Sequence, residues 1–359
     1  MEEPSLNSRD EGFDFSNLVR ENVLKFVLDN WSSDEESSET TINLGRTGNP
    51  LGSPLHSGLN HYSSNSYQGI CDVISKIKGV PIKNILAGSE RENLYDLLLG
   101  AFCEPLSDSI VSISSATNCL EKLSVLRNIK IKSISLGEDL RIDFDLLADA
   151  IQDKTKLIFI SSPHEITGMS VSFEELELIL NNFHGIVVVD ESYINYSRQK
   201  SFLAELLEYP NLLIVQSFSK AWGLEAIGLG FMFGSETIIQ LLNKIKNPFQ
   251  LNQLTQSFIS DAMKQLEWVN NSIKSTVEER NRLKDFLLSV SIVENVYPSD
   301  ANFLLVIFKN GTLVKNVLAE NNIVVSDFSQ LVGYANCLRI SIGTPEQNNS
   351  LIAALQGIV

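Results

Sequence analysis

The chain has 359 residues, of which 43% are hydrophobic and 20% are charged, and its formal net charge is −16. This length suits a large domain with a smaller one attached, and the composition is ordinary for a globular protein. A strongly acidic chain without a basic cluster argues against nucleic acid or an anionic membrane surface as a partner.

The N-terminus and the cysteines point to a cytosolic protein. The first residues, MEEPSLNSRDEGFDF, are acidic and polar, unlike a signal or transit peptide, and no apolar run is long enough to span a bilayer. The four cysteines are scattered and form no CxxC pair, so we expect reduced thiols. The four histidines are widely spaced, which argues against a metal site.

Helices and strands are expected to alternate through the first two thirds of the chain. After a helical pattern at 15–27, we expect helices at 67–80, 92–102, 143–152 and 173–183. We expect strands at 109–114, 131–136, 156–162, 185–192, 211–218 and 228–234. Nearly continuous apolar runs such as KLIFISS indicate strands covered on both faces. The pattern therefore predicts a mainly parallel sheet with helices on both sides.

The pattern changes after residue 240. Residues 253–290 suit long helices, followed by strands at 302–308, 322–326 and 337–343 and a helix at 312–321. We therefore divide the chain into four parts. These are an acidic segment with a helix (1–40), a large α/β domain (41–240), connecting helices (241–290) and a small α+β domain (291–359).

Ligands of open parallel sheets bind beyond the carboxyl ends of the strands, which directs attention to 162–168, 190–193 and 217–220. Lys220 follows a predicted buried strand, within QSFSKAWGL. A low dielectric lowers the pKa of a lysine and makes its amine a nucleophile toward an aldehyde. The alternative is an ordinary lysine that reaches solvent from a loop, and this motif alone leaves the two interpretations about even.

Asp190 ends the apolar run IVVVD. A carboxylate there can pair with a pyridinium nitrogen, although helix caps and turns use aspartate as well. A lysine about thirty residues after an aspartate, each ending a buried strand, is a much more specific signal than either residue alone.

With these motifs the chain resembles the class I and II aminotransferases, which use pyridoxal phosphate (PLP), and most of all the histidinol-phosphate aminotransferases. The resemblance runs from INLGRTGNPLGSP (42–54) to CLRISIGTPEQNN (337–349) and includes VVVDESYINYS (187–197) and SFSKAWGL (217–224). It implies PLP fold type I, an α/β fold whose large domain has a mainly parallel sheet and whose small domain is α+β. It also implies PLP as the cofactor and a homodimer with shared active sites.

The resemblance assigns roles to residues of the large domain. Lys220 matches the Schiff-base lysine, Asp190 the partner of the ring nitrogen, and Tyr193 the hydroxyl that contacts the ring oxygen. Ser217 and Ser219 match hydroxyls near the cofactor phosphate.

Further roles fall outside these strand ends. Tyr62 matches the tyrosine that reaches the phosphate from the neighbouring subunit. Arg339 matches the arginine that grips the substrate carboxylate, a task for which a bidentate guanidinium is suited. Asn49 also falls at a substrate position. The family's phosphate loop, GNGSDE, reads GSEREN (88–93) here, and we assign Ser89, Glu90 and Arg91 to the cofactor. Backbone amides at a helix N-terminus bind anions, and Arg91 could supply positive charge.

The chain departs from the family at telling positions. Gly228 replaces the arginine that clamps the cofactor phosphate, and Thr117 replaces the aromatic residue that stacks on the ring. Each loss should cost about 1–3 kcal/mol of cofactor binding. Glu165 stands where the family has an asparagine, as a new acid or base or as a side chain that points to solvent. Ser326 replaces the arginine that binds the substrate phosphate.

Three functions are compatible with these residues. The first is a PLP enzyme acting on an amino acid or amine other than histidinol phosphate, by transamination, decarboxylation, elimination or cyclisation. The second is an enzyme without PLP that uses Lys220, Glu165 and Asp190 in acid–base chemistry. The third is a non-catalytic binding or regulatory protein.

Overall fold

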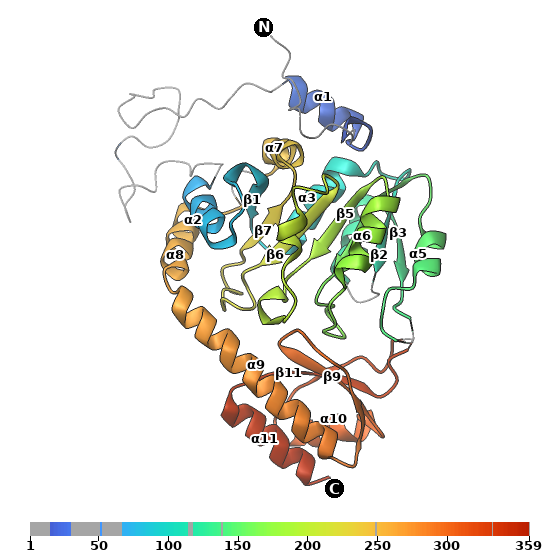
Figure 1. The fold of residues 1–359 in the computed structure, drawn as a ribbon, viewed down its shortest axis with the longest axis vertical. Coiled ribbons are helices and arrows are strands. Elements are labelled where there is room, and N and C mark those ends of the chain that lie inside the picture. Colours follow the sequence, from blue (N-terminus) through green and yellow to red (C-terminus); the bar gives the residue numbers. More distant parts are fainter. Residues whose placement is uncertain are drawn as a thin grey trace.

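The computed structural model describes residues 15–29, 51, 67–113, 118–137, 139–247, 250–331 and 333–358. In these residues the chain forms two bodies, a larger one built on a seven-stranded sheet and a smaller one built on a four-stranded sheet. The long helix α9 (Leu266–Ser289) runs from the first body along the second (Figure 1). In the described parts of the chain, every helix is too short or too polar to span a bilayer.

The seven-stranded sheet has the order β1-β7-β6-β5-β4-β2-β3. Its strands are β1 (Ile85–Gly88), β2 (Ser109–Ile113), β3 (Lys130–Ile134), β4 (Thr155–Ser161), β5 (Ile186–Asp190), β6 (Leu212–Ser217) and β7 (Gly230–Phe233). Strands β2 to β6 are parallel, whereas β7 runs antiparallel to both β6 and β1. The prediction of a mainly parallel sheet is confirmed, but β1 and the reversed direction of β7 were not foreseen.

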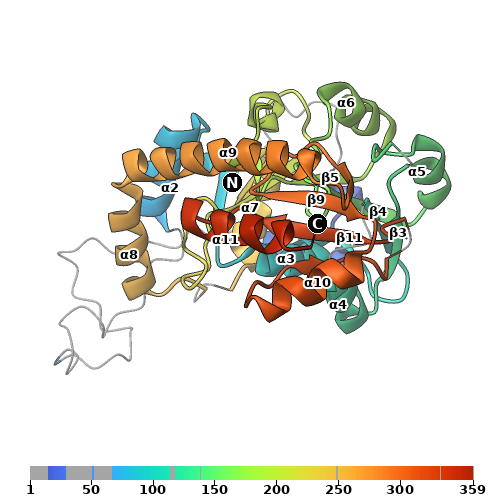
Figure 2. The same ribbon diagram turned by 90° about the horizontal axis from the view of Figure 1, so that it is seen from below.

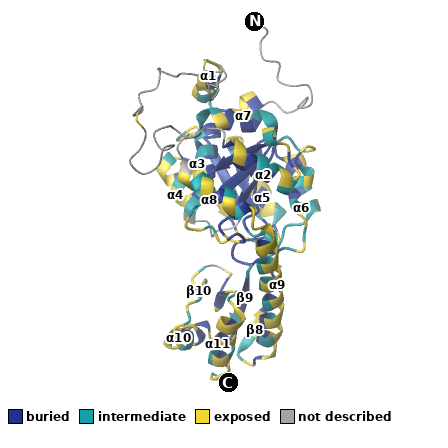
Figure 3. Cartoon of the chain, turned by 90° about the vertical axis from the view of Figure 1, so that its left-hand side faces the viewer, coloured by how far each residue is buried: buried dark blue, intermediate teal, exposed yellow. Residues whose placement is uncertain are grey.

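Alternate side chains of the strands enter two different cores. In β5, Ile186 and Val188 pack with α1 (Glu21–Asp29), α3 (Arg91–Phe102), α4 (Asn118–Arg127) and α7 (Glu236–Ile245). On the other face, Val187 and Val189 pack with α2 (Gln68–Lys78), α5 (Phe144–Ala150), α6 (Phe173–Asn182) and α8 (Gln253–Met263). Burial of each such side chain contributes roughly 1.5–3 kcal/mol. Figure 3 shows the central strands as buried.

The smaller sheet is antiparallel, with the order β10-β11-β9-β8. Its strands are β8 (Val293–Val296), β9 (Phe303–Phe308), β10 (Ser326–Asp327) and β11 (Cys337–Ser341). Helix α9 packs against it together with α10 (Gly311–Glu320) and α11 (Pro345–Gln356), as Figure 2 shows from below. The domain boundaries at residues 40, 240 and 290 stay a prediction.

Two expected elements differ from the structure. The strand expected at 322–326 is reduced to β10, because Asn322 takes a left-handed φ of 58° just after α10. The helix expected at 15–27 is divided into a 3-10 turn (Phe15–Asn17) and α1. The reason is that the backbone N–H of Arg20 donates to Ala101 O, at 3.0 Å, rather than to the preceding turn.

Buried polar contacts fix the two bodies against each other near the strand ends. Arg280, on α9, is 3% exposed, and its Nη1 donates to Tyr196 O at 3.2 Å and to Ala301 O at 2.7 Å. The backbone N–H of Asp300 donates to Gly168 O at 2.7 Å. These contacts hold the loop after β4 against the smaller body, and that loop carries Glu165.

Candidate active site

A cleft of about 590 Å³ opens where the carboxyl ends of β5 and β6 face the smaller sheet. It lies close to the N-terminus of α3, and β11 closes it from the other body. Its lining includes Glu90, Arg91, Glu165, Tyr193, Lys220 and Arg339, together with Ser217 and Ser219. The structure thus brings together most of the residues that were predicted from the sequence.

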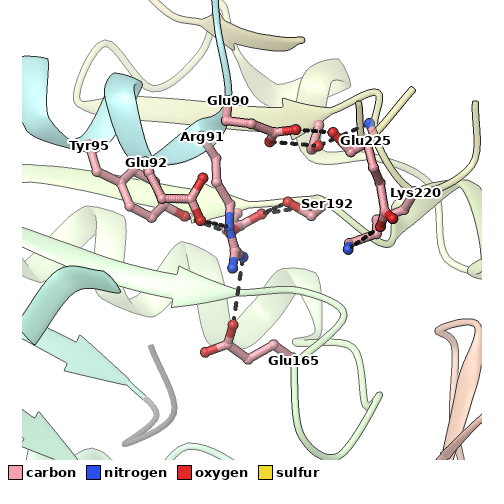
Figure 4. A network of polar contacts seen from close by, with 11 residues as sticks. Glu90, Arg91, Glu92, Tyr95, Glu165, Ser192, Lys220 and Glu225 are labelled. Carbon is pink, nitrogen blue, oxygen red and sulfur yellow. Dashed lines mark hydrogen bonds and ion pairs between the residues drawn. The ribbon is translucent and has the colours of Figure 1, made fainter. Parts of the chain in front are cut away.

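Asp190 lies behind the lining of this cleft, in contact with the lining residue Arg91, and is 4% exposed. Arg91 Nη1 is 2.9 Å from Asp190 Oδ2, and the Tyr95 hydroxyl donates to the same oxygen at 2.6 Å. The hydroxyl and the backbone N–H of Ser192 both donate to Oδ1. The carboxylate is therefore fully engaged by the chain's own donors (Figure 4).

Arg91 bridges two carboxylates. Besides its contact with Asp190, its Nη1 is 3.6 Å from Glu165 Oε2. Burial alone would lower the pKa of Arg91, but the negative charges around it more than offset this effect and hold the pKa above its ordinary value. The guanidinium is therefore charged. We expected it to face a phosphate, whereas in this structure it pairs with Asp190.

Glu90 reaches the two serines that were predicted to bind phosphate. Its carboxylate accepts hydrogen bonds from Ser219 Oγ and, at 3.4 Å, from Ser217 Oγ. Gly228 lies beside it, and a Cβ at that position would be 3.2 Å from Glu90 Cγ. A larger side chain at position 228 would therefore crowd Glu90 where it now lies. Ser89 takes no part in this contact, and its Oγ accepts from Asn93 Nδ2 at 2.7 Å.

Lys220 is at the mouth of the cleft. Its side chain is 37% exposed, and its Nζ is 2.7 Å from Glu225 Oε1. The expectation of a lysine in a low-dielectric environment is not met in this arrangement, because solvent and a carboxylate reach the amine. Tyr193 lies deeper, where burial raises the pKa of its hydroxyl, and its ring packs edge-on against Phe303 with centroids 5.3 Å apart.

Glu165 points into the cleft, so the alternative that it faces solvent is wrong. The residue is 8% exposed, and its Oε1 has no hydrogen-bond partner among the described residues. Burial raises the pKa of Glu165 to about 7, and Asp190 adds to this while Arg91 and Arg339 oppose it. The preceding His164 shapes the turn, because its Nδ1 accepts from the N–H groups of Ile166 and Thr167 at 3.3 and 3.1 Å.

Arg339 reaches the cleft from β11 between two aromatic rings. Its guanidinium carbon is 4.9 Å from the centroid of Phe303 and 5.2 Å from that of Phe328. Its Nη1 donates to Glu165 O at 2.6 Å, while its Nε finds no partner within the described parts of the chain. Cation–π contacts with these two rings hold the guanidinium in place.

Some residues of the site were missed from the sequence, and others cannot be placed. Tyr95 lies four residues after Arg91 on the same helix face, so helical spacing could have indicated it. Ser192 is two residues after Asp190, so its closeness in the sequence could have indicated it. Nothing in the sequence marked Phe303 or Glu225. Asn49, Tyr62 and Thr117 lie outside the described residues, so their predicted roles stay predictions.

Comparisons with known proteins show a similarity in sequence to one family. A sequence model described as "Aminotransferase class I and II" matches residues 118–355. The histidinol-phosphate aminotransferase of Parabacteroides distasonis is 36% identical over 345 residues, covering 96% of this chain and 99% of that protein.

Two solved structures have the same fold. One is the histidinol-phosphate aminotransferase of Sinorhizobium meliloti in complex with pyridoxal-5'-phosphate. Its TM-score is 0.74 at 17% identity, with 84% of both chains covered. The other is the L-threonine-O-3-phosphate decarboxylase of Porphyromonas gingivalis. Its TM-score is 0.69 at 20% identity, with 83% of this chain and 93% of that chain covered.

Proposed function

Because the chain belongs to the class I and II aminotransferases, we propose that it is a histidinol-phosphate-aminotransferase-like PLP enzyme whose substrate is an amino acid or amine other than histidinol phosphate. The likenesses confirm the expected fold type I, an enzyme of this family, and PLP as the cofactor to which the family points. They give no support to an enzyme without PLP or to a non-catalytic binding protein. The observation that carries the proposal is that Tyr193, Lys220 and Arg339 line one cleft. Asp190 lies behind this lining, paired with the lining residue Arg91 at 2.9 Å.

The donor set of the cleft fits PLP, because the chain's own side chains stand in for two parts of the cofactor. A carboxylate, from Glu90, lies on the hydroxyls of Ser217 and Ser219. A planar cation with N–H donors, from Arg91, lies on Asp190. PLP has the same two features, an anionic phosphate at one end and a ring nitrogen that carries a proton at the other.

PLP, when bound, withdraws electrons from the substrate carbon whose bond is broken. Asp190 would hold the proton on the ring nitrogen, and the Tyr193 hydroxyl would orient the ring by its oxygen. The Lys220 amine would hold the cofactor through its aldehyde carbon, and as a free amine it would move a proton at the substrate α-carbon. For this task Lys220 must leave Glu225. Arg339 would bind the substrate carboxylate.

The charges of the cleft support a substrate without a phosphate. Four glutamates line the cleft (Glu90, Glu92, Glu165 and Glu225), against three basic side chains (Arg91, Lys220 and Arg339). Ser326, which replaces the substrate-phosphate arginine of the family, lies beside Arg339 in the β10–β11 pair. A substrate phosphate at this position would therefore meet a neutral serine instead of an arginine. Transamination, decarboxylation, elimination and cyclisation would all use the same residues.

The remaining expectations are part of the same proposal. From the family resemblance we infer that two copies assemble into a homodimer. From the scattered cysteines, which form no CxxC pair, we infer that the protein is cytoplasmic.

Absorption spectroscopy with added PLP tests the proposal. The native chain should develop a visible band that borohydride abolishes, and Lys220→Ala should lack it. Lys264→Ala is a matched control, because Lys264 is another exposed lysine whose Nζ lies 2.7 Å from a carboxylate oxygen. Amino acids without phosphate should then shift the band, whereas histidinol phosphate should not. A native chain without the band would refute a PLP enzyme, and a shift by histidinol phosphate alone would refute the substrate class.

A further inference from the structure

Glu90 already occupies the position where the phosphate of the cofactor would bind. Its carboxylate takes hydrogen bonds from both Ser217 and Ser219. Glu90 is also the N-cap residue of α3, yet its side chain makes no capping bond among the described residues. The short N-cap side chains Ser, Thr, Asp and Asn usually accept from the first N–H groups of their own helix. Here it reaches across to the serines of the neighbouring strand end instead.

Arg91, the next residue, occupies the position where the protonated ring nitrogen of the cofactor would bind. Arg91 lies against Asp190 at 2.9 Å and near Glu165 at 3.6 Å. Asp190 is almost fully buried, so an unpaired charge there would be costly. Arg91 removes this cost in the absence of any ligand, and its side chain is itself only 21% exposed.

The two contacts are coupled by the chain, because they come from consecutive residues at the start of one helix (Figure 4). Their polarity matches that of PLP, with the anion on the serines and the cation on Asp190. Each contact takes up donors or acceptors that the cofactor would need. Both side chains must therefore withdraw before PLP can bind in the way the family resemblance implies.

We propose that Glu90 and Arg91 form an intramolecular surrogate for PLP, which stabilises the cofactor-free site and competes directly with the cofactor. The inference rests on the proposed function, since it concerns the binding of PLP. It makes these two residues determinants of cofactor affinity. Their removal should have two effects of opposite sign, a less stable cofactor-free protein and a tighter cofactor complex.

Glu90→Ala is the decisive variant. Without PLP, its melting temperature should fall by several degrees, because the serine hydroxyls lose a charged partner. Its dissociation constant for PLP, measured by fluorescence titration, should fall at least about tenfold, as expected when a competing charge-assisted hydrogen bond is removed. A purely structural role predicts the opposite for the cofactor, since a damaged site binds its ligand less tightly.

Glu92→Ala is the matched control. Glu92 is the next acidic residue along the chain and lines the same cleft, but in the described contacts its side chain pairs with Arg91 and not with the serines. Its loss removes the same charge from the cleft and should change the dissociation constant for PLP by less than about threefold.

The outcomes separate this inference from the proposed function. Arg91→Leu provides a second test of the surrogate, with a lower melting temperature and tighter PLP binding expected. If the native chain binds PLP and Glu90→Ala binds it no more tightly, the surrogate is refuted and the proposed function stands. If Glu92→Ala tightens binding as much as Glu90→Ala, net charge rather than occupancy sets the affinity, and the surrogate is refuted. If none of the proteins binds PLP, both proposals are wrong.

Discussion

Replacing Glu165 by glutamine should change how the stability of the cofactor-free protein depends on pH. Burial raises the pKa of Glu165 from 4.5 to about 7. Between these values the folded protein keeps a proton that the unfolded chain has released. The free energy of unfolding must therefore fall as the pH rises from 4.5 to 7. A shift of this size corresponds to about 3 kcal/mol at 1.36 kcal/mol per pKa unit.

Glu165→Gln keeps the size and the neutral form of the side chain but cannot ionise. Urea unfolding of both proteins from pH 5 to pH 8 isolates the contribution of the carboxyl group. The stability of the variant relative to the native chain should rise by about 2–3 kcal/mol over this range. Parallel profiles would mean that Glu165 is ionised throughout and stabilised by Arg91, and the reasoning from burial would be wrong.

Two further predictions concern the loop that carries Glu165. Burial lowers the pKa of His164 from 6.5 to about 4, so stability is lost as the pH falls between these values. His164→Asn keeps an acceptor for the turn but cannot take up this proton. In unfolding measurements, the variant should lose up to about 3 kcal/mol less free energy of unfolding than the native chain as the pH falls from 6.5 to 4. Gly168 has a φ of 76°, and an added Cβ would collide with the Ser299 side chain. Gly168→Ala should therefore lower the free energy of unfolding by about 2–4 kcal/mol, and an unchanged value would refute the clash.

Much of the fold followed from the sequence because its strands are buried on both faces. In β5, four apolar residues precede Asp190, and the longer runs of this kind were found, whereas the short buried strand β1 was missed. The direction of β7 could not be predicted in this way. Its composition is equally apolar, and only its pairing with β1 and β6 sets its direction. Short edge elements such as β10 carry too few residues to show any pattern.

The positions of the site residues were predictable, but their pairing was not. Asp190 and Lys220 could be placed because each follows a strand of the same sheet. The partner of Asp190 is Arg91, which lies 99 positions away in the sequence, and a sequence does not say which of several acidic groups an arginine will choose. The same holds for Glu90, whose carboxylate reaches Ser219 across 129 positions. Such contacts depend on the folded geometry of α3 against β6.

The pairing of Asp190 with Arg91 also bears on how the protein matures in the cell. A buried carboxylate that waits for a cofactor leaves the newly made chain with an uncompensated charge, and such chains spend more time unfolded and exposed to proteases. Here the cation that neutralises Asp190 is Arg91, a side chain of the same polypeptide, so no ligand is needed to supply it. On the surrogate proposal, we therefore expect folding of the new chain to depend less on the supply of its cofactor.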